Sequence, residues 1–205
     1  MAVKPGNFVH LHLHSQYSIL DGAIKIKDLV DKAAEFGMPA VAITDHGNMY
    51  ASYELYKTCK ELKEKKGLRV KPIIGQEFYI AKGSRFDKSK GKEGEKGSYH
   101  LILLAKNDKG LKNLMKLSSI GFTEGFYYKP RIDKEVLEKY SEGLIALSAC
   151  IQGEVPLLHL MGKEKEAEEA AKWYKELFGD DFYLEIQYHG IKEQEKANRL
   201  SLIHI

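Results

Sequence analysis

Three histidines stand on alternate residues near the start of the chain, in the stretch HLHLHSQYSILDG that runs from His10 to Gly22. In a β-strand this spacing places all three imidazoles on one face. The stretch is either a buried strand that happens to be rich in histidine or the first part of a metal site, because imidazole is a common metal ligand. The other ionisable side chains decide between these interpretations.

Further side chains of ligand type recur at or near the ends of the expected strands. His46 follows AVAITD, Glu77 lies in IIGQEFYI, and Cys150 ends GLIALSAC. A parallel α/β fold gathers its functional residues at the ends of its strands. The candidate metal ligands selected by this argument are His12, His14, Asp21, His46, Glu77, His100 and Cys150.

A group of this composition favours bound metal over coincidental polar residues in a core. Burying several ionisable groups without an ion costs roughly several kcal/mol for each group. Imidazole and carboxylate ligands suit Zn, Mn or Fe better than Ca or Mg. Two close metal ions can hold a hydroxide and the oxygens of a phosphate, with Glu77 as the bridging carboxylate. We therefore expect a phosphoesterase whose catalytic residues are His12, His14 and Glu77.

Other catalytic motifs do not compete with this interpretation. The chain contains neither GxSxG, the motif of a serine nucleophile, nor GxxxxGK[ST], the motif of a phosphate-binding loop. The segment SACIQGE shows no activating base beside Cys150. We therefore expect this thiol to be a ligand rather than a nucleophile.

Four more residues are candidates for supporting roles. His10 lies roughly 7 Å further along the expected strand than His12, so we expect it to hydrogen-bond a ligand carboxylate. Asp45 is expected to orient a ligand or to cap the following helix. Lys129 and Arg131, in YYKPRID, are candidate phosphate contacts, although surface packing explains them equally well.

The elements that must position these residues alternate between strand and helix. Apolar runs predict strands at 8–14, 40–44, 70–80, 99–106, 143–149 and 182–187, and periodic patterns predict helices at 25–37, 52–66, 109–122, 166–179 and from 191 onward. This order predicts an α/β fold with a largely parallel sheet. An open doubly wound sheet and a closed barrel give the same pattern.

Composition limits the class of protein. The 205 residues are 43% hydrophobic and 30% charged, which fits one globular domain. The net charge of +3 comes from 32 basic and 29 acidic residues, a balance that excludes nucleic-acid binding through a global field. Two distant cysteines and the absence of a signal peptide predict a cytoplasmic location. No apolar run approaches the roughly 20 residues that span a bilayer.

The last six residues, LSLIHI, interrupt an amphipathic helical pattern. The transposase end sequence used in DNA library preparation, CTGTCTCTTATACACATC, encodes these same six residues. We therefore interpret residues 200–205 as a read-through scar and expect a single domain over residues 1–199.

The segments HLHLHSQYSILDG, AITDHGNM, KPIIGQEFYI, YHLILLAKN and LIALSACIQGEV together resemble the N-terminal PHP (polymerase and histidinol phosphatase) domain of the alpha subunit of bacterial DNA polymerase III. The resemblance extends from Phe8 to about Arg199. It implies a distorted barrel of about seven βα units, here incomplete at its C-terminus. It also assigns the metal ligands, for up to three divalent ions, to the same seven residues.

This resemblance implies a fragment of a replicative DNA polymerase. Its PHP domain would be a multi-metal phosphoesterase and a proofreading 3′–5′ exonuclease, and its partners would be DNA, a sliding clamp and a proofreading subunit. The family's later Asp-x-His pair is absent, so we expect this chain to bind metal weakly and to be nearly inactive. The alternatives are a catalytically silent, metal-stabilised module that docks a proofreading subunit, and a free-standing phosphatase of a small ester such as histidinol phosphate.

Overall fold

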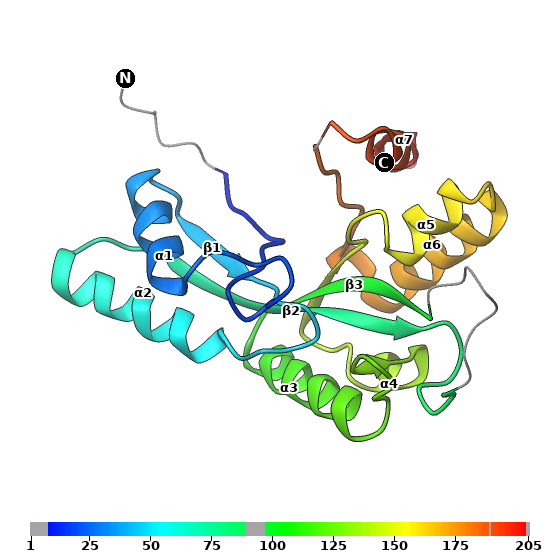
Figure 1. Ribbon diagram of the computed structural model, residues 1–205, viewed down its shortest axis with the longest axis horizontal. Helices are drawn as coiled ribbons and strands as arrows, with labels where there is room; N and C mark the ends of the chain where they lie inside the picture. The colour runs from blue at the N-terminus through cyan, green and yellow to red at the C-terminus, as the bar shows by residue number, and fades with distance from the viewer. Residues whose placement is uncertain (1–7, 89–96, 189, 204–205) are drawn as a thin grey trace. The chain divides into compact units, whose positions relative to one another are not determined.

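The chain forms two compact units, which meet in the sequence between Gln76 and Glu77. The computed structural model describes residues 8–88, 97–188 and 190–203. The boundary falls within strand β2 (Lys71–Ala81), so the last residues of the first unit and the first residues of the second belong to one strand. Figure 1 shows the order of the elements along the chain.

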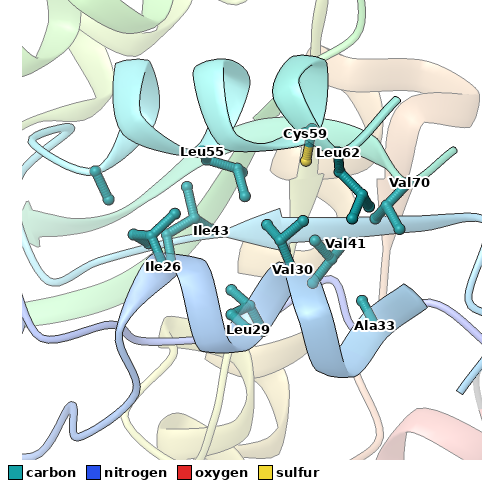
Figure 2. Close-up of a cluster of buried hydrophobic side chains, with 11 residues drawn as sticks. Ile26, Leu29, Val30, Ala33, Val41, Ile43, Leu55, Cys59, Leu62 and Val70 are labelled. Atoms are coloured by element: carbon teal, nitrogen blue, oxygen red, sulfur yellow. The ribbon is translucent and has the colours of Figure 1, made fainter. Parts of the chain in front are cut away.

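The first unit contains helix α1 (Ile26–Glu35), strand β1 (Ala40–Ile43), helix α2 (Ser52–Lys66) and the start of β2. Apolar residues of α1 recur at the spacing of one helical face. All four residues of β1 are buried, as a strand covered on both sides requires. The two helices and β1 share one apolar core, which Figure 2 shows: Ile26, Leu29, Val30, Ala33, Val41, Ile43, Ala51, Leu55, Cys59, Leu62 and Val70.

The second unit alternates short strands with helices of very different length. Its elements after β2 are β3 (Ser98–Ala105), α3 (Asp108–Thr123), β4 (Arg131–Ile132), α4 (Lys134–Lys139), β5 (Leu144–Leu147), α5 (Glu154–Leu160), α6 (Glu164–Phe178), the 3-10 turn η1 (Gly179–Asp181), β6 (Phe182–Tyr183) and α7 (Lys192–Ile203). Helices α5 and α6 lie side by side (Figure 1). The side chains of Asn107 and Asp133 cap the N-termini of α3 and α4, because each accepts a backbone N–H of the first turn.

The six strands are hydrogen-bonded in the order β1-β2-β3-β5-β6, and β4 also pairs with β2. The pairs β1–β2, β2–β4 and β5–β6 are parallel, whereas β3 and β5 are antiparallel. Among the described strands no pairing closes the sheet. The predicted α/β fold is confirmed, and the sheet formed by the described strands is open.

One predicted strand is wrong: residues 8–14 form no regular strand. The segment still runs along β1, because the carbonyl oxygens of His10 and Leu13 accept hydrogen bonds from Ala42 and Thr44 at 2.9 Å. Two residues lie between the acceptors His10 and Leu13, but only one lies between the donors Ala42 and Thr44, so the segment carries one residue too many for a ladder. The Thr44 hydroxyl instead accepts the Leu13 N–H at 2.8 Å.

The other predicted elements are present with shifted ends. The predicted helix at 52–66 matches α2 residue for residue, whereas the predicted strand at 182–187 is reduced to the two residues of β6. Helix α7 continues past Arg199 to Ile203. The interpretation of residues 200–205 as a scar stays a prediction, and residues 204–205 lie outside the described part of the chain. Among the described helices, none has the length and apolar character needed to cross a membrane.

A close backbone approach in the second unit generates a stability prediction. A Cβ atom added to Gly110, in the first turn of α3, would overlap the carbonyl oxygen of Gly143. We expect Gly110→Ala to lower the free energy of unfolding by about 1–3 kcal/mol, because the backbone must shift to relieve the overlap. Chemical denaturation measures this change. Gly83→Ala is the matched control, since its Cβ meets no atom within 4 Å; equal stability of the two variants would contradict the prediction.

Candidate metal centre

The first unit brings three predicted imidazole ligands together. The Nε2 atoms of His12 and His14 face one another at 3.2 Å. The ring of His14 stacks on that of His46, with 3.9 Å between ring centroids and 21° between planes. His46 Nε2 lies 2.9 Å from a carboxylate oxygen of Asp21. Four of the seven predicted ligands therefore form one continuous group within the first unit.

The buried carboxylate of Asp45 holds the loop that carries this group. One of its oxygens accepts the backbone N–H of Ser15 at 2.6 Å and the hydroxyl of Ser18 at 2.7 Å, and the other accepts the Ser15 hydroxyl at 2.8 Å. Only 1% of Asp45 is exposed. Hydrogen bonds to an ionised group are stronger than neutral ones, so this carboxylate fixes the residues between His14 and Asp21.

The loop after β1 is tied to the same segment. The Ser18 hydroxyl, which donates to Asp45, also accepts the backbone N–H of His46 at 3.1 Å. The Asn48 amide donates to the carbonyl oxygens of His46 and Tyr17, at 3.0 and 3.3 Å. These bonds hold the backbone of His46 against the loop that carries Asp21, and none of them involves the side chain of His46 or Asp21.

The remaining three predicted ligands lie together in the second unit. Glu77 on β2 is 1% exposed, and its Oε1 atom lies 3.0 Å from Nδ1 of His100 on β3. The thiol of Cys150, which follows β5, lies 3.8 Å from the same nitrogen. The carbonyl oxygen of Gln152 accepts the backbone N–H of His100 at 3.0 Å. Carboxylate, imidazole and thiol thus converge on one point within the second unit.

The environment of Cys150 disfavours a free thiolate. Burial, together with the negative charges of Glu77 and Glu185, raises the pKa of this thiol to about 11. At neutral pH the group is therefore a neutral thiol in the absence of a cation, which disfavours a nucleophilic role. A cation at this position would favour the thiolate, because a coordinating thiol is deprotonated.

Both groups have donor sets that fit divalent transition metals. Two nitrogen ligands of a tetrahedral zinc ion lie about 3.3 Å apart, and a nitrogen and a sulfur ligand about 3.6 Å apart, given the usual Zn–N and Zn–S lengths. The corresponding separations here are 3.2 Å for His12 and His14 and 3.8 Å for His100 and Cys150. Mixed nitrogen, oxygen and sulfur donors suit Zn, Mn or Fe rather than Ca.

The predicted supporting residues have different surroundings in the structure. Asp45 orients the ligand loop, as described above. His10 is exposed, and its ring packs edge-on against Phe8, with the centroids 4.9 Å apart. Arg131 is buried, and its guanidinium donates to the carbonyl oxygens of Gly125, Arg85 and Asp87. The predicted roles of His10 and Arg131 beside a ligand or a phosphate stay predictions.

Sequence reasoning missed the residues that hold the ligands in place. Ser15 and Ser18 bind the Asp45 carboxylate, and Tyr79 packs its ring edge-on against that of His100 at 5.2 Å. A weak signal for the serines was present, because both lie between two predicted ligands in HSQYSILD. Nothing in the spacing of Tyr79 distinguishes it from an ordinary strand residue.

The Asp45 hydrogen bonds generate a second stability prediction. We expect Asp45→Asn to lower the free energy of unfolding by roughly 2 kcal/mol, because it removes the charge from three hydrogen bonds and turns an amide NH₂ toward a donor. Denaturant unfolding measures the change, and faster hydrogen exchange at the Ser15 amide locates it. Asp28→Asn, on the exposed face of α1, is the control. An Asp45 variant as stable as this control would contradict the account.

Comparisons with known proteins identify the family of the chain. The chain is 57% identical over 203 residues to the DNA polymerase III subunit alpha of Aquifex aeolicus, a match that covers 97% of this chain and 17% of the relative. The same subunit of Borreliella burgdorferi is 54% identical (93% and 16% covered), and that of Deinococcus radiodurans is 48% identical (95% and 15% covered). The chain thus spans about one sixth of the length of the curated relatives that it matches.

A solved structure from Bifidobacterium adolescentis, named for a metal-dependent phosphoesterase, has a similar fold. The TM-score is 0.51 at 14% identity, and the match covers 98% of this chain and 85% of the other. At this identity the likeness shows the fold alone. The family model of the PHP domain matches residues 10–189, which include all seven predicted ligands. On this evidence the chain belongs to the PHP domain family.

Proposed function

We propose that the seven predicted ligands bind divalent metal ions and that the chain is a phosphoesterase domain acting on phosphodiesters. The two groups of donor atoms support this proposal. His12, His14, His46 and Asp21 lie together in the first unit, and Glu77, His100 and Cys150 lie together in the second. Imidazole, carboxylate and thiol donors gathered in this way suit divalent transition metals.

Each residue has a separate task in this proposal. His12 and His14 present neutral nitrogen lone pairs, and Glu77 supplies a carboxylate able to bridge two ions, so these three are the proposed catalytic residues. When bound, the metal ions lower the pKa of a water molecule and stabilise the charge that develops on a phosphate. Asp45 contacts no reacting group; it orients the loop of Asp21 and His46.

The proposed substrate is DNA, and the proposed reaction is 3′–5′ exonucleolytic hydrolysis. The relatives are polymerase alpha subunits, about six times the length of the match. We propose that this chain is the N-terminal part of such a DNA-directed DNA polymerase, in the cytoplasm, working with a sliding clamp and a proofreading subunit. Lys129 and Arg131 stay as proposed contacts near the substrate phosphate.

The length of the relatives also bears on the alternatives. A free-standing phosphatase of a small ester would need relatives of roughly the same length as this domain, and the relatives described above are far longer. A metal-stabilised structural module remains the second candidate, because metal ions bound by residues of several loops and strands would stabilise the fold whether or not they hydrolyse anything. The proposed metals are Zn, Mn or Fe, up to three per complete domain.

Removing the imidazoles of His12 and His14 tests both the proposed phosphoesterase and the alternative of a metal-stabilised structural module. Added Zn²⁺ or Mn²⁺ is expected to raise the midpoint of thermal unfolding of the chain, since a ligand at a hundred times its Kd stabilises by about 2.7 kcal/mol. His12→Ala combined with His14→Ala is expected to abolish this rise, together with the weak metal-dependent release of nucleotides from single-stranded DNA. Calorimetry and a labelled-oligonucleotide assay measure the two effects.

His10→Ala is the matched control, because it removes an exposed imidazole from the same segment. Both effects should survive in this variant. A double variant that keeps the metal-induced rise would refute the metal centre. If metal stabilises both the 205-residue chain and a full-length alpha subunit but neither hydrolyses DNA, the result would instead identify the structural module. Strong hydrolysis by the 205-residue chain would contradict the expectation that it lacks part of the ligand set.

A further inference from the structure

A cavity of about 680 Å³ lies within the second unit, next to its group of ligands. This volume is in the range of about 300–1,000 Å³ that is usual for small-molecule sites. The polar and aromatic residues of its lining that matter here are Lys82, His100, Tyr127, Tyr128, Lys129 and Gln152. Because His100 is also a proposed metal ligand, a molecule in the cavity would lie beside the proposed centre.

Two lysines give the cavity its positive charge. The Lys129 ammonium lies over the ring of Tyr79, 4.3 Å from its centroid, and that of Lys82 lies over Tyr99 at 5.3 Å. These cation–π contacts hold both ammonium groups without neutralising them. The same Tyr79 ring packs against His100, so one aromatic side chain connects Lys129 with the proposed centre.

Two buried arginines support the lining of the cavity, and one of them, Arg131, lines it. Arg131 donates to the carbonyl oxygens of Arg85 and Asp87, at 3.2 and 2.7 Å. Arg85 in turn contacts both oxygens of Asp133 at 3.1 Å and donates to Glu124 at 2.7 Å. These bonds fix the segment that follows β2. The Asp87 carboxylate also lines the cavity, and it partly offsets the positive charge of the two lysines.

An exposed aromatic ring stands at the edge of this cavity in a strained turn. Tyr128 is 78% exposed, and its φ of 58° lies in the left-handed region that residues other than glycine rarely adopt. The turn is closed by a hydrogen bond of 3.1 Å from the Tyr127 N–H to the Lys129 carbonyl oxygen. Backbone strain of this kind clusters at ligand-binding sites.

We propose that this cavity binds a terminal nucleotide of single-stranded DNA, with its phosphate at Lys82 and Lys129 and its base stacked on Tyr128. Flat aromatic rings beside cationic groups are the usual platform for unpaired bases. A small phosphate ester would leave the aromatic edge unused, and a base inside a duplex could not reach it. The inference rests on the proposed function, because it names the substrate of that centre.

The test measures binding without catalysis. The probe is a fluorescein-labelled eight-residue oligo(dT), and fluorescence anisotropy is recorded with the 205-residue chain in EDTA. We expect Lys129→Ala and Tyr128→Asn each to weaken binding by about fivefold or more, given the usual contribution of one stacked base. Asn is chosen at position 128 because it tolerates a left-handed backbone. Lys172→Ala and Tyr53→Ala remove an exposed lysine and an exposed tyrosine elsewhere and should bind like the unmodified chain.

Competition then identifies what the cavity recognises. Thymidine monophosphate is expected to displace the probe at a concentration at least tenfold lower than inorganic phosphate does. Equal potency of the two would overturn the proposal, because it would mean that a phosphate alone is bound. Binding within twofold of the unmodified chain in both cavity variants would also overturn it.

The test of the cavity and the test of the phosphoesterase can succeed or fail independently of one another. Binding that depends on Tyr128 and Lys129 in EDTA, with no hydrolysis in any metal, would support the cavity and refute the phosphoesterase. Metal-dependent hydrolysis that is unaffected by both variants would support the phosphoesterase and refute the cavity.

Discussion

One strand, β2, is the constraint on which both groups of ligands depend. Its first residues pair with β1 in the first unit, and its later residues pair with β4 in the second. Glu77, the first residue of the second unit, lies on this strand with its carboxylate buried. A buried carboxylate is costly unless it is paired, and here His100 lies within 3.0 Å. The strand therefore combines structural pairing with the most buried of the proposed ligands.

The ligand-bearing loops of the first unit are positioned by polar contacts rather than by a regular sheet. The segment from His10 to His14 has one residue too many to form a ladder with β1, and the Thr44 side chain replaces a backbone acceptor. Asp45 then gathers the following loop through Ser15 and Ser18. A regular strand would have set the imidazoles by alternation alone. Here their approach depends on a few buried side-chain hydrogen bonds, which is why the Asp45 carboxylate matters.

Much of this arrangement could be predicted from the sequence. The order of strands and helices followed from apolar periodicity, which is strong in α1 because that helix buries one face. The proximity of His12, His14 and His46, and of Glu77, His100 and Cys150, followed from their places near strand ends. The ligand types themselves carried this information, because so many of them are rarely buried without a partner.

Other features could not be predicted, for physical reasons. The short elements β4 and α4 hold too few residues for a periodic pattern. Residues 8–14 follow an irregular path because the spacing of the acceptors His10 and Leu13 differs from that of their donors, Ala42 and Thr44. No local sequence pattern encodes this difference. The pattern YYKPRID left Arg131 open between a phosphate contact and packing, and it did not indicate that the guanidinium is buried and donates to carbonyl oxygens. Tertiary contacts therefore decided the roles that residue type and spacing left open.

The central claim is that the proposed imidazole ligands of the first unit bind a divalent metal ion. X-ray absorption at the zinc edge, on the chain loaded with one equivalent of Zn²⁺, tests it directly because it counts imidazole ligands. The first unit offers three proposed imidazoles, those of His12, His14 and His46. We predict at least two imidazoles around the zinc, and we predict that they are lost in the variant that lacks His12 and His14. A set of zinc ligands that is unchanged in that variant would contradict the claim.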